Sequence, residues 1–323
     1  MLAFTNRDAI EQNKTAARDG LRSLPGVDGV SETGIRIRPM GDVDLERVRE
    51  LRSVVRWAAD PRAFDLLRGM REARWAVAEA PDGSLAGMVG AVPLGRIGVL
   101  CHLAVRDDHR NMGLGVRLSA WAALYLRSRG AGMVRLYSTR RAEGLYLSLG
   151  FRPGAPRTVY RLDEARRGGG GEAADGHRVR MLSFGDLPEV YGLDRWSYGA
   201  DRSALIFATL RLHPGGGLIA RDSSGSVKGY LVQSSSGRVS RIGPFVASTP
   251  DVARHLLAGA LRAGGGSSVE VTVPGVAESP AHELLREFGF RGRRDRLQME
   301  LGEEDGVLQG RMEHYGTTPY LAT

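Results

Sequence analysis

The sequence predicts an α/β (α+β) fold arranged as two tandem units. Three observations favour it: short β-competent runs alternate with amphipathic helical stretches, a glycine-rich segment interrupts the chain, and the pattern before that segment is repeated after it. With 323 residues, 42% of them hydrophobic and 25% charged, the chain has an ordinary globular composition and enough length for two hydrophobic cores.

Composition also marks the boundaries of the units. Residues 164–178 include four consecutive glycines and an Ala-Ala-Asp-Gly run, which is typical of a flexible linker. Residues 1–33 are polar and are broken by Pro-Gly and Asp-Gly pairs. We therefore expect an N-terminal arm over 1–33, a first domain over 34–163, the linker over 164–178 and a second domain over 179–323.

The first domain is predicted to open with a strand, two helices and a hairpin. Residues 35–39 alternate in hydrophobicity, as a half-buried strand does. Asp42 or Asp44 is expected to cap a helix whose inner face carries Leu45, Val48, Leu51 and Val55. A second helix after Pro61 is predicted to turn inward Phe64, Leu67 and Met70. Residues 75–79 and 87–92, joined by a Pro-Asp-Gly turn, indicate an antiparallel hairpin.

The most informative stretch runs from residue 99 to residue 130. A short apolar strand over 99–105 is followed by a charged turn and then by the loop Arg110, Asn111, Met112, Gly113, Leu114 and Gly115. The helix that opens from this loop has an apolar stripe of Leu114, Leu118, Trp121, Ala122 and Tyr125 and ends at Gly130. Because the first N–H groups of a helix lack intrahelical acceptors, this loop and first turn can receive a diphosphate.

A second block lies downstream, in the expected order. Residues 133–137 are predicted to form a strand, and Tyr146 precedes Gly150 and Phe151 with the spacing Tyr-x-x-x-Gly-Phe. Together with the Arg-x-x-Gly-x-Gly loop, this block resembles the GNAT (Gcn5-related) N-acetyltransferases. The resemblance covers about residues 35–320. The tandem layout looks like the bacterial YitH-like subgroup, whose C-terminal domain is a degenerate GNAT-like copy.

The resemblance implies a fold, a co-substrate and a reaction. Each unit is expected to be a mixed, mostly antiparallel sheet flanked by helices. The expected activity is direct transfer of an acetyl group from acetyl-CoA to a primary amine of a small-molecule acceptor within a ternary complex. The residues implied to bind acetyl-CoA are Leu103, Ala104, Val105, Arg110, Asn111, Met112, Gly113, Leu114, Gly115 and Val116.

The resemblance also implies catalytic roles. Tyr146 is the expected proton donor to the departing thiolate, and a main-chain N–H of residues 103–105 is the expected oxyanion donor. Many relatives carry a glutamate base where this chain has Val99, Cys101 and His102. His102 is a candidate base or a structural histidine, and Glu79 and Glu72 are alternatives. Cys101 is expected to be a small buried residue rather than a nucleophile.

The second copy lacks the parts that carry this chemistry. Residues 229–233 repeat the pattern of 87–91, and Glu287 to Phe290 repeats the Gly-Phe block. Where the first copy has its glycine loop, residues 247–253 contain neither glycine and place Asp251 at the start of a helix. Leu285 stands where the first copy has Tyr146. We expect that this copy neither binds nor uses the cofactor.

Charge and residue counts limit other functions. The net charge of +8 comes from arginines spread along the chain, so no nucleic-acid partner is expected. One cysteine and seven histidines without ligand spacing give no metal site. No signal peptide or membrane span is recognisable, which predicts a cytoplasmic protein with no membrane partner. The alternative to an enzyme is a non-catalytic scaffold that responds to acyl-CoA.

Overall fold

The computed structural model describes residues 33–55, 61–163, 178–263, 268–275, 279–302 and 313–317. The chain divides into two compact units. The first unit comprises Met1–Pro61, Arg71–Pro153 and Met299–Asp305, and the second comprises Arg62–Met70, Gly154–Gln298 and Gly306–Thr323. Most of the predicted arm and of the predicted linker lies outside the described residues.

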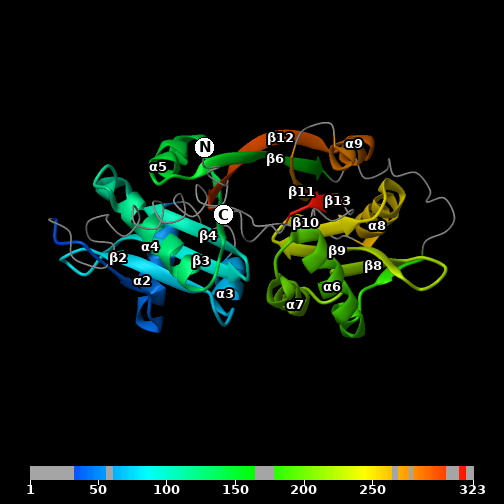
Figure 1. The fold of residues 1–323 in the computed structure, drawn as a ribbon, viewed down its shortest axis with the longest axis horizontal. Coiled ribbons are helices and arrows are strands. Elements are labelled where there is room, and N and C mark those ends of the chain that lie inside the picture. The colour runs from blue at the N-terminus through cyan, green and yellow to red at the C-terminus, as the bar shows by residue number, and fades with distance from the viewer. Residues whose placement is uncertain are drawn as a thin grey trace, which may run out of the picture. The chain divides into compact units, whose positions relative to one another are not determined.

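The first unit is a mixed sheet with helices packed on it (Figure 1). Its strands follow the order β1-β2-β3-β4-β5, and every neighbouring pair is antiparallel except β4 and β5, which are parallel. This confirms the predicted fold class. The elements are β1 (Arg36–Pro39), α2 (Leu45–Val54), β2 (Arg74–Glu79), β3 (Leu85–Leu94), β4 (Ile97–Val105), α4 (Leu114–Ser128), β5 (Met133–Ser138) and α5 (Glu143–Ser148), with short 3-10 turns at Asp42–Asp44, Asp107–His109 and Arg140–Ala142.

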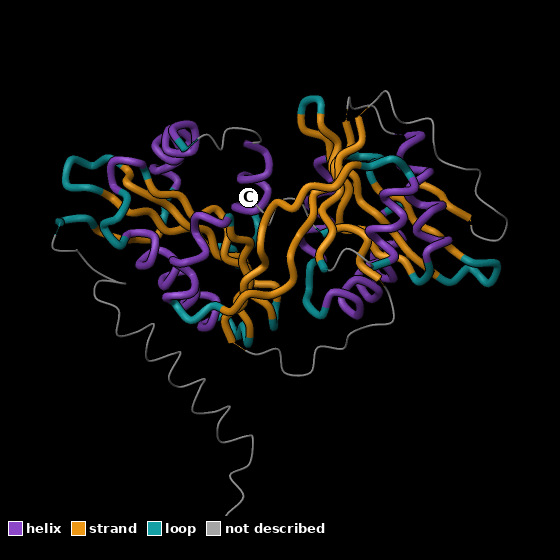
Figure 2. The backbone as a smooth tube through the Cα atoms, turned by 90° about the horizontal axis from the view of Figure 1, so that it is seen from above, coloured by secondary structure: helices purple, strands orange, loops and turns teal. Residues whose placement is uncertain are grey.

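The second unit is likewise built of strands with helices packed on them (Figure 2). Its strands follow the order β12-β6-β11-β10-β9-β8-β7, with β13 also paired to β10. Helix α3 (Pro61–Arg68) groups with this unit, and its Phe64 and Leu67 are buried as predicted. The elements are β6 (Arg152–Asp163), β7 (Arg178–Met181), α6 (Leu187–Tyr198), α7 (Ser203–Leu212), β8 (Gly217–Arg221), β9 (Val227–Ser236), β10 (Val239–Ala247), α8 (Pro250–Ala263), β11 (Ser268–Pro274), α9 (Pro280–Glu287), β12 (Arg291–Gly302) and β13 (Glu313–Gly316).

One glycine in each unit shows how closely the second repeats the first. A Cβ on Gly87 would lie 2.8 Å from the Ala104 carbonyl oxygen and 3.0 Å from Leu118. A Cβ on Gly229 would lie 2.7 Å from the carbonyl oxygen of Val246 and 3.0 Å from a leucine of α8. In both units only glycine lets the strand pack this closely under the helix. The tandem repeat read from the sequence is therefore present in three dimensions.

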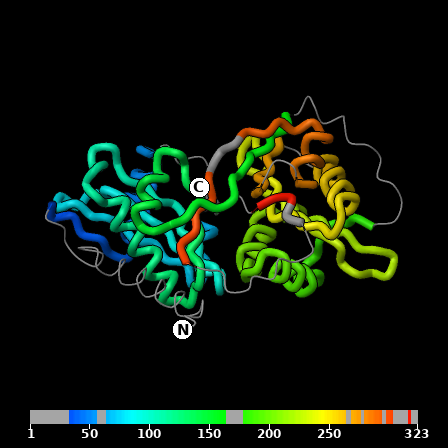
Figure 3. Tube along the Cα trace, turned by 45° about the horizontal axis from the view of Figure 1, so that its top comes forward, coloured from blue at the N-terminus to red at the C-terminus, as the bar shows by residue number. Residues whose placement is uncertain are grey.

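β6 and β12 each begin in one compact unit and end in the other, and their colours can be followed in Figure 3. β6 leaves the first unit after Pro153 and pairs antiparallel with β11, from Arg157↔Pro274 to Asp163↔Ser268. The end of β12 returns to the first unit. There Glu300 lies 2.8 Å from Arg135, and the Leu301 carbonyl accepts a hydrogen bond of 3.2 Å from Arg127.

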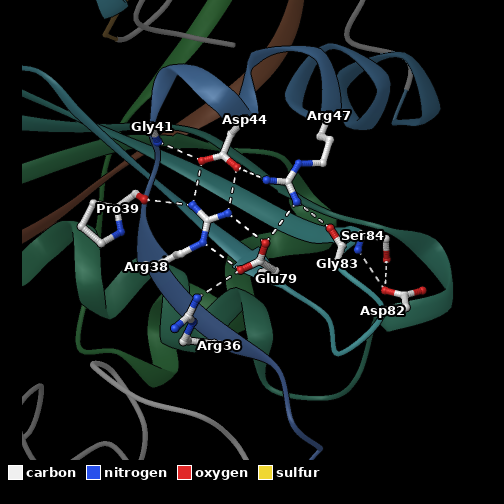
Figure 4. Close-up of polar contacts among 10 residues, drawn as sticks. All are labelled: Arg36, Arg38, Pro39, Gly41, Asp44, Arg47, Glu79, Asp82, Gly83 and Ser84. Atoms are coloured by element: carbon white, nitrogen blue, oxygen red, sulfur yellow. Dashed lines mark hydrogen bonds and ion pairs between the residues drawn. The ribbon is translucent and has the colours of Figure 1, made fainter.

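An ion-pair cluster ties β1, β2 and α2 together in the first unit (Figure 4). Arg38 donates to both oxygens of Asp44 at 2.7 and 2.8 Å and to Glu79 at 2.8 Å. Arg47 donates to Glu79 at 3.1 Å and also contacts Asp44. The Asp44 side chain is fully buried, and hydrogen bonds from Arg38 hold the pKa values of Asp44 and Glu79 at about 2.

The second unit carries the same cluster with two charges exchanged. Arg180 donates to Asp186 at 2.6 and 2.8 Å, as Arg38 does to its aspartate. Arg221 takes the place of the β2 glutamate and Glu189 takes the place of the α2 arginine, with contacts of 2.9 Å from Arg221 to Asp186 and 2.6 Å to Glu189. The arrangement is preserved although the two signs are reversed, which indicates a structural role for the cluster.

Candidate functional site

The first unit contains a cleft where β4 and β5 separate. The two strands pair from Ile97↔Met133 to Val99↔Arg135, and the cleft opens beyond this register. Its volume is about 470 Å³. The residues that line it are Val55, Leu103, Ala104, Val105, His109, Arg110, Asn111, Gly113, Leu114, Gly115, Val116, Thr139, Arg141, Ala142 and Leu145. The structure thus brings together every residue that we expected to bind acetyl-CoA except Met112, which is 42% exposed on the loop.

The loop before α4 needs its two glycines for different reasons. Gly113 has φ 72° and caps the helix, and a Cβ there would meet no atom within 4 Å, so its conformation rather than its space requires glycine. A Cβ on Gly115 would lie 2.6 Å from Leu145, so here space is limiting. Asn111, with φ 63°, also adopts the left-handed conformation.

The N-terminus of α4 faces the cleft with unused donors. The first bond of the helix runs from the Arg117 N–H to the Gly113 carbonyl at 3.1 Å. The N–H groups of Leu114, Gly115 and Val116 precede that bond, so they have no intrahelical acceptor, and all three residues line the cleft. With the positive end of the helix dipole, they form a site suited to an anion such as a diphosphate.

Cationic side chains surround the same end of the cleft. Arg110 and Arg141 line it, and Arg110 is paired with Asp107 at 2.5 Å. His109 lies 2.7 Å from Asp108. Arg141, Thr139 and Leu145 were missed by the sequence reasoning, because they follow β5 and reach the cleft only through the tertiary fold.

His102 lies in a bulge of β4. Between Ala104↔Met88 and Cys101↔Gly90 the register shifts, and His102 has φ 53°. It is 1% exposed, and its Nδ1 accepts a hydrogen bond of 2.8 Å from Arg52 of α2. Arginine has no acceptor, so the proton of neutral His102 sits on Nε2. In this geometry His102 is a donor at Nε2, and it can accept a proton at Nδ1 only after Arg52 has moved away.

The bulge also changes the position of Cys101. Regular strand alternation would turn Cys101 and His102 to opposite faces of the sheet, but the bulge interrupts that alternation and both side chains are buried. Burial raises the pKa of the Cys101 thiol to about 12. A thiol with that pKa is a poor nucleophile near neutral pH.

Tyr146 sits on α5 behind the cleft. It is 5% exposed and packs edge-on against Phe151, with ring centroids 5.7 Å apart. The preceding residue, Leu145, lines the cleft. Backbone bonds fix the motif, because the Phe151 N–H donates to the Tyr146 carbonyl at 3.0 Å and Gly150 has φ 82°. The predicted spacing therefore corresponds to a tight helix end.

The two glutamates considered as alternative bases are engaged elsewhere. Glu79 belongs to the cluster of Figure 4, where hydrogen bonds from Arg38, Arg47 and Arg36 keep its pKa at about 2. Glu72 is exposed and forms an ion pair with Arg129. Because its carboxylate is held so firmly in the ionised state, Glu79 is a weak base.

The corresponding helix of the second unit is capped differently. At α8 the Val252 N–H donates to the side-chain oxygen of Thr249 at 3.3 Å, and Asp251 lies in the first turn. Leu285 replaces Tyr146, since the Phe290 N–H donates to its carbonyl at 2.9 Å just as Phe151 does in the first unit. Neither the glycines of the α4 loop nor the tyrosine of α5 has a counterpart at these positions.

Comparison with known proteins identifies the family. Residues 71–153 and residues 190–314 each match a family profile described as an acetyltransferase (GNAT) domain. The chain belongs to the GNAT acetyltransferase family. An uncharacterized N-acetyltransferase of Bacillus subtilis, YitH, is 25% identical over 213 residues, covering 65% of this chain and 71% of YitH. As GNAT proteins transfer acetyl groups, the chain is an acyltransferase.

Solved structures show the same tandem GNAT fold. A putative acetyltransferase from Pyrococcus horikoshii superposes with a TM-score of 0.72 at 20% identity, covering 92% of this chain and 98% of that one. A tandem GNAT protein from the clavulanic acid biosynthesis pathway superposes with a TM-score of 0.61 at 17% identity, covering 84% of this chain and all of that one (100%). Two GNAT units in one chain are therefore a fold that solved proteins share.

In the described ranges, no three His, Cys, Asp or Glu side chains gather into a group that could hold a metal ion. None of the helices in those ranges is both long enough and apolar enough to cross a membrane.

Proposed function

We propose that the first unit transfers an acetyl group from acetyl-CoA to a primary amine of a small molecule, with both substrates bound together. The observation that carries this proposal is the cleft itself, because a helix N-terminus with free donors, two arginines and the open edge of β4 meet in one space of about 470 Å³. The diphosphate would bind the N–H groups of residues 114–116, and the thioester arm would follow Leu103 to Val105.

The reaction requires two proton movements and one charge to be stabilised. The amine nitrogen bonds to the thioester carbonyl carbon, the carbon–sulfur bond breaks, the amine loses one proton and the thiolate gains one. A main-chain N–H of residues 103–105 would stabilise the charge on the carbonyl oxygen. We assign the proton donor to Tyr146, which directly follows the cleft-lining Leu145 on α5.

We assign the role of general base to His102, in a conformation in which Arg52 no longer occupies its Nδ1. Arg52 occupies Nδ1, so the side chain accepts a proton only when Arg52 turns away, for example toward an anionic group of the acceptor. In the wild type kcat/KM should rise with pH, and this rise should be lost in His102→Gln. An unchanged rising limb in that variant would remove His102 from the mechanism and leave it a structural role.

The acid assignment is tested by following free thiol release from acetyl-CoA over a panel of primary amines. Tyr146→Phe is expected to lower kcat by about 10²–10⁴-fold, the usual contribution of a general acid, while acetyl-CoA still binds. The matched control is Tyr125→Phe, since that hydroxyl donates to the Glu72 carbonyl at 2.7 Å on the exposed side of α4 and should leave kcat unchanged. Acetyl-CoA binding without turnover on any amine would instead favour the scaffold hypothesis.

A further inference from the structure

In the second unit, a short strand fills the place where the first unit has its cleft. β13 runs antiparallel to the end of β10, from Phe245↔Gly316 to Ala247↔Glu313. On its other side the Thr317 N–H donates to the Thr272 carbonyl of β11 at 2.8 Å. The segment Glu313–Thr317 therefore lies between β10 and β11, with β13 paired to β10 and Thr317 hydrogen-bonded to β11 (Figures 1 and 3).

The strand pair β10–β11 of the second unit corresponds closely to the pair β4–β5 of the first. β10 and β11 are parallel from Val239↔Ser268 to Ile242↔Val271, as β4 and β5 are parallel at the start of their length. Beyond that point each of the first strands of these pairs has a bulge, between Ile242 and Phe245 in β10 and next to His102 in β4. The first unit then opens into the cleft, and the second unit receives β13.

The inserted strand fits its groove closely. Tyr315 is 1% exposed, and its ring lies 5.2 Å from that of Phe245. A Cβ on Gly316 would lie 3.0 Å from Val271, 3.1 Å from the Ile242 carbonyl oxygen and 3.3 Å from Phe245. A side chain here would push these three neighbours away by a few tenths of an ångström, at the point where the two strands begin to part.

A buried cation holds the end of the inserted segment. Arg157 of β6 is 1% exposed and donates to the side-chain oxygen of Thr317. The same oxygen lies 3.3 Å from the Thr272 carbonyl. A guanidinium this deeply buried needs polar partners, and Thr317 supplies one of them, so the segment contributes polar as well as apolar contacts.

We infer that the second unit is a strand-binding groove whose resident ligand is the segment Glu313–Thr317, and that this ligand excludes acyl-CoA from the second unit. The groove would therefore recognise an extended peptide with an aromatic residue followed by glycine, through main-chain pairing and one aromatic pocket. The exclusion rests on the proposed function, since it equates the space of β13 with the space that the thioester arm takes in the first unit. The recognition of a peptide does not rest on the proposed function.

The first test uses the full chain. Gly316→Val should loosen the segment, because the added methyl groups meet Val271, Phe245 and a carbonyl oxygen. Hydrogen exchange in residues 313–317 should become at least about tenfold faster than in the wild type. The control is Gly192→Val on α6, where a Cβ would meet no atom within 4 Å, and it should leave that exchange unchanged. Equal exchange in the two variants would overturn the inference.

The second test uses the full-length Gly316→Val variant and a labelled synthetic peptide of residues 311–323. Because the variant's own segment is loosened, the variant should bind the peptide 1:1, and the same peptide with Gly316→Val should bind at least about tenfold more weakly. The wild-type chain should also bind the unchanged peptide at least about tenfold more weakly, since its groove is filled. Equal binding of both peptides, or no binding by a variant that still binds acetyl-CoA, would overturn the inference.

The number of acetyl-CoA molecules bound separates the two proposals. Titration calorimetry should give one per chain for the wild type. Two per wild-type chain would mean that the second unit takes acyl-CoA with the segment in place, and would overturn the exclusion. None in the full chain would refute the proposed function, and the peptide result would still stand or fall alone.

Discussion

Replacing Gly113 by aspartate tests the placement of the diphosphate most directly. At φ 72° a residue other than glycine costs about 1–2 kcal/mol, with aspartate at the lower end because it tolerates the left-handed region. In a domain of this size each kcal/mol lowers Tm by about 2–4 °C. The variant should therefore fold, with a modestly lower Tm.

The effect on binding should be much larger than the effect on stability. Since the Gly113 Cβ position faces open space at the end of α4, an aspartate there would lie near the bound diphosphate. At a separation of about 5 Å and an effective dielectric constant of about 20, each phosphate charge would be repelled by about 3 kcal/mol. One such repulsion weakens binding by at least about a hundredfold.

The matched control is Gly95→Asp in the turn between β3 and β4. Gly95 has φ 77° and its Cβ position is also open, but it does not line the cleft. Both variants should lose the same few degrees of Tm in a melting experiment, and only Gly113→Asp should lose the thermal shift that CoA produces. Suppose that both variants keep the shift, and that the CoA concentration giving half of it stays within about threefold of the wild-type value. The diphosphate then does not bind at α4.

Three further predictions concern stability, each measured by urea unfolding. Exchanging the charges of the first cluster (Arg47→Glu with Glu79→Arg) should restore most of the stability that each single variant loses, because the second unit already uses the reversed pair; a double variant as weak as the sum of the singles contradicts this. The stability lost in Arg38→Met should be greatest above pH 4.5 and should shrink as the pH falls toward 2, since the lowered pKa of Glu79 stabilises the fold only while the carboxylate is ionised; a loss independent of pH would argue against it. Arg202→Met should cost about 3–5 kcal/mol, because it leaves the 1% exposed carboxylate of Asp194 without its 2.6 Å partner; a cost below about 1 kcal/mol would show that the pair is not needed.

The parts of the fold that depend on local sequence could be predicted. The hairpin of β2 and β3, the start of α4 and the Gly-Phe blocks follow from turn residues and from hydrophobic period, which act over a few positions. Gly150 and Gly289 illustrate this, since both adopt φ near 80° at the end of a helix, where the sequence placed the two equivalent blocks.

The parts that depend on distant partners could not be predicted. The bulge at His102 arises from the register between β4 and β3, and strand alternation contains no sign of it. The contact between Arg52 and His102 spans 50 residues. The partners of β6 and β13 also lie far away in the sequence, and no short-range pattern says which neighbour a strand will choose.

The crossing of β6 and β12 has a practical consequence for work on isolated halves. A fragment ending at residue 163 would carry β6 without β11, its partner along seven register positions from Arg157 to Asp163. The same fragment would lack Glu300 and Leu301, which bind Arg135 and Arg127 beside β5. Expression of either half alone would leave unpaired strand edges that invite aggregation, so each unit is best studied within the full chain, by point substitutions.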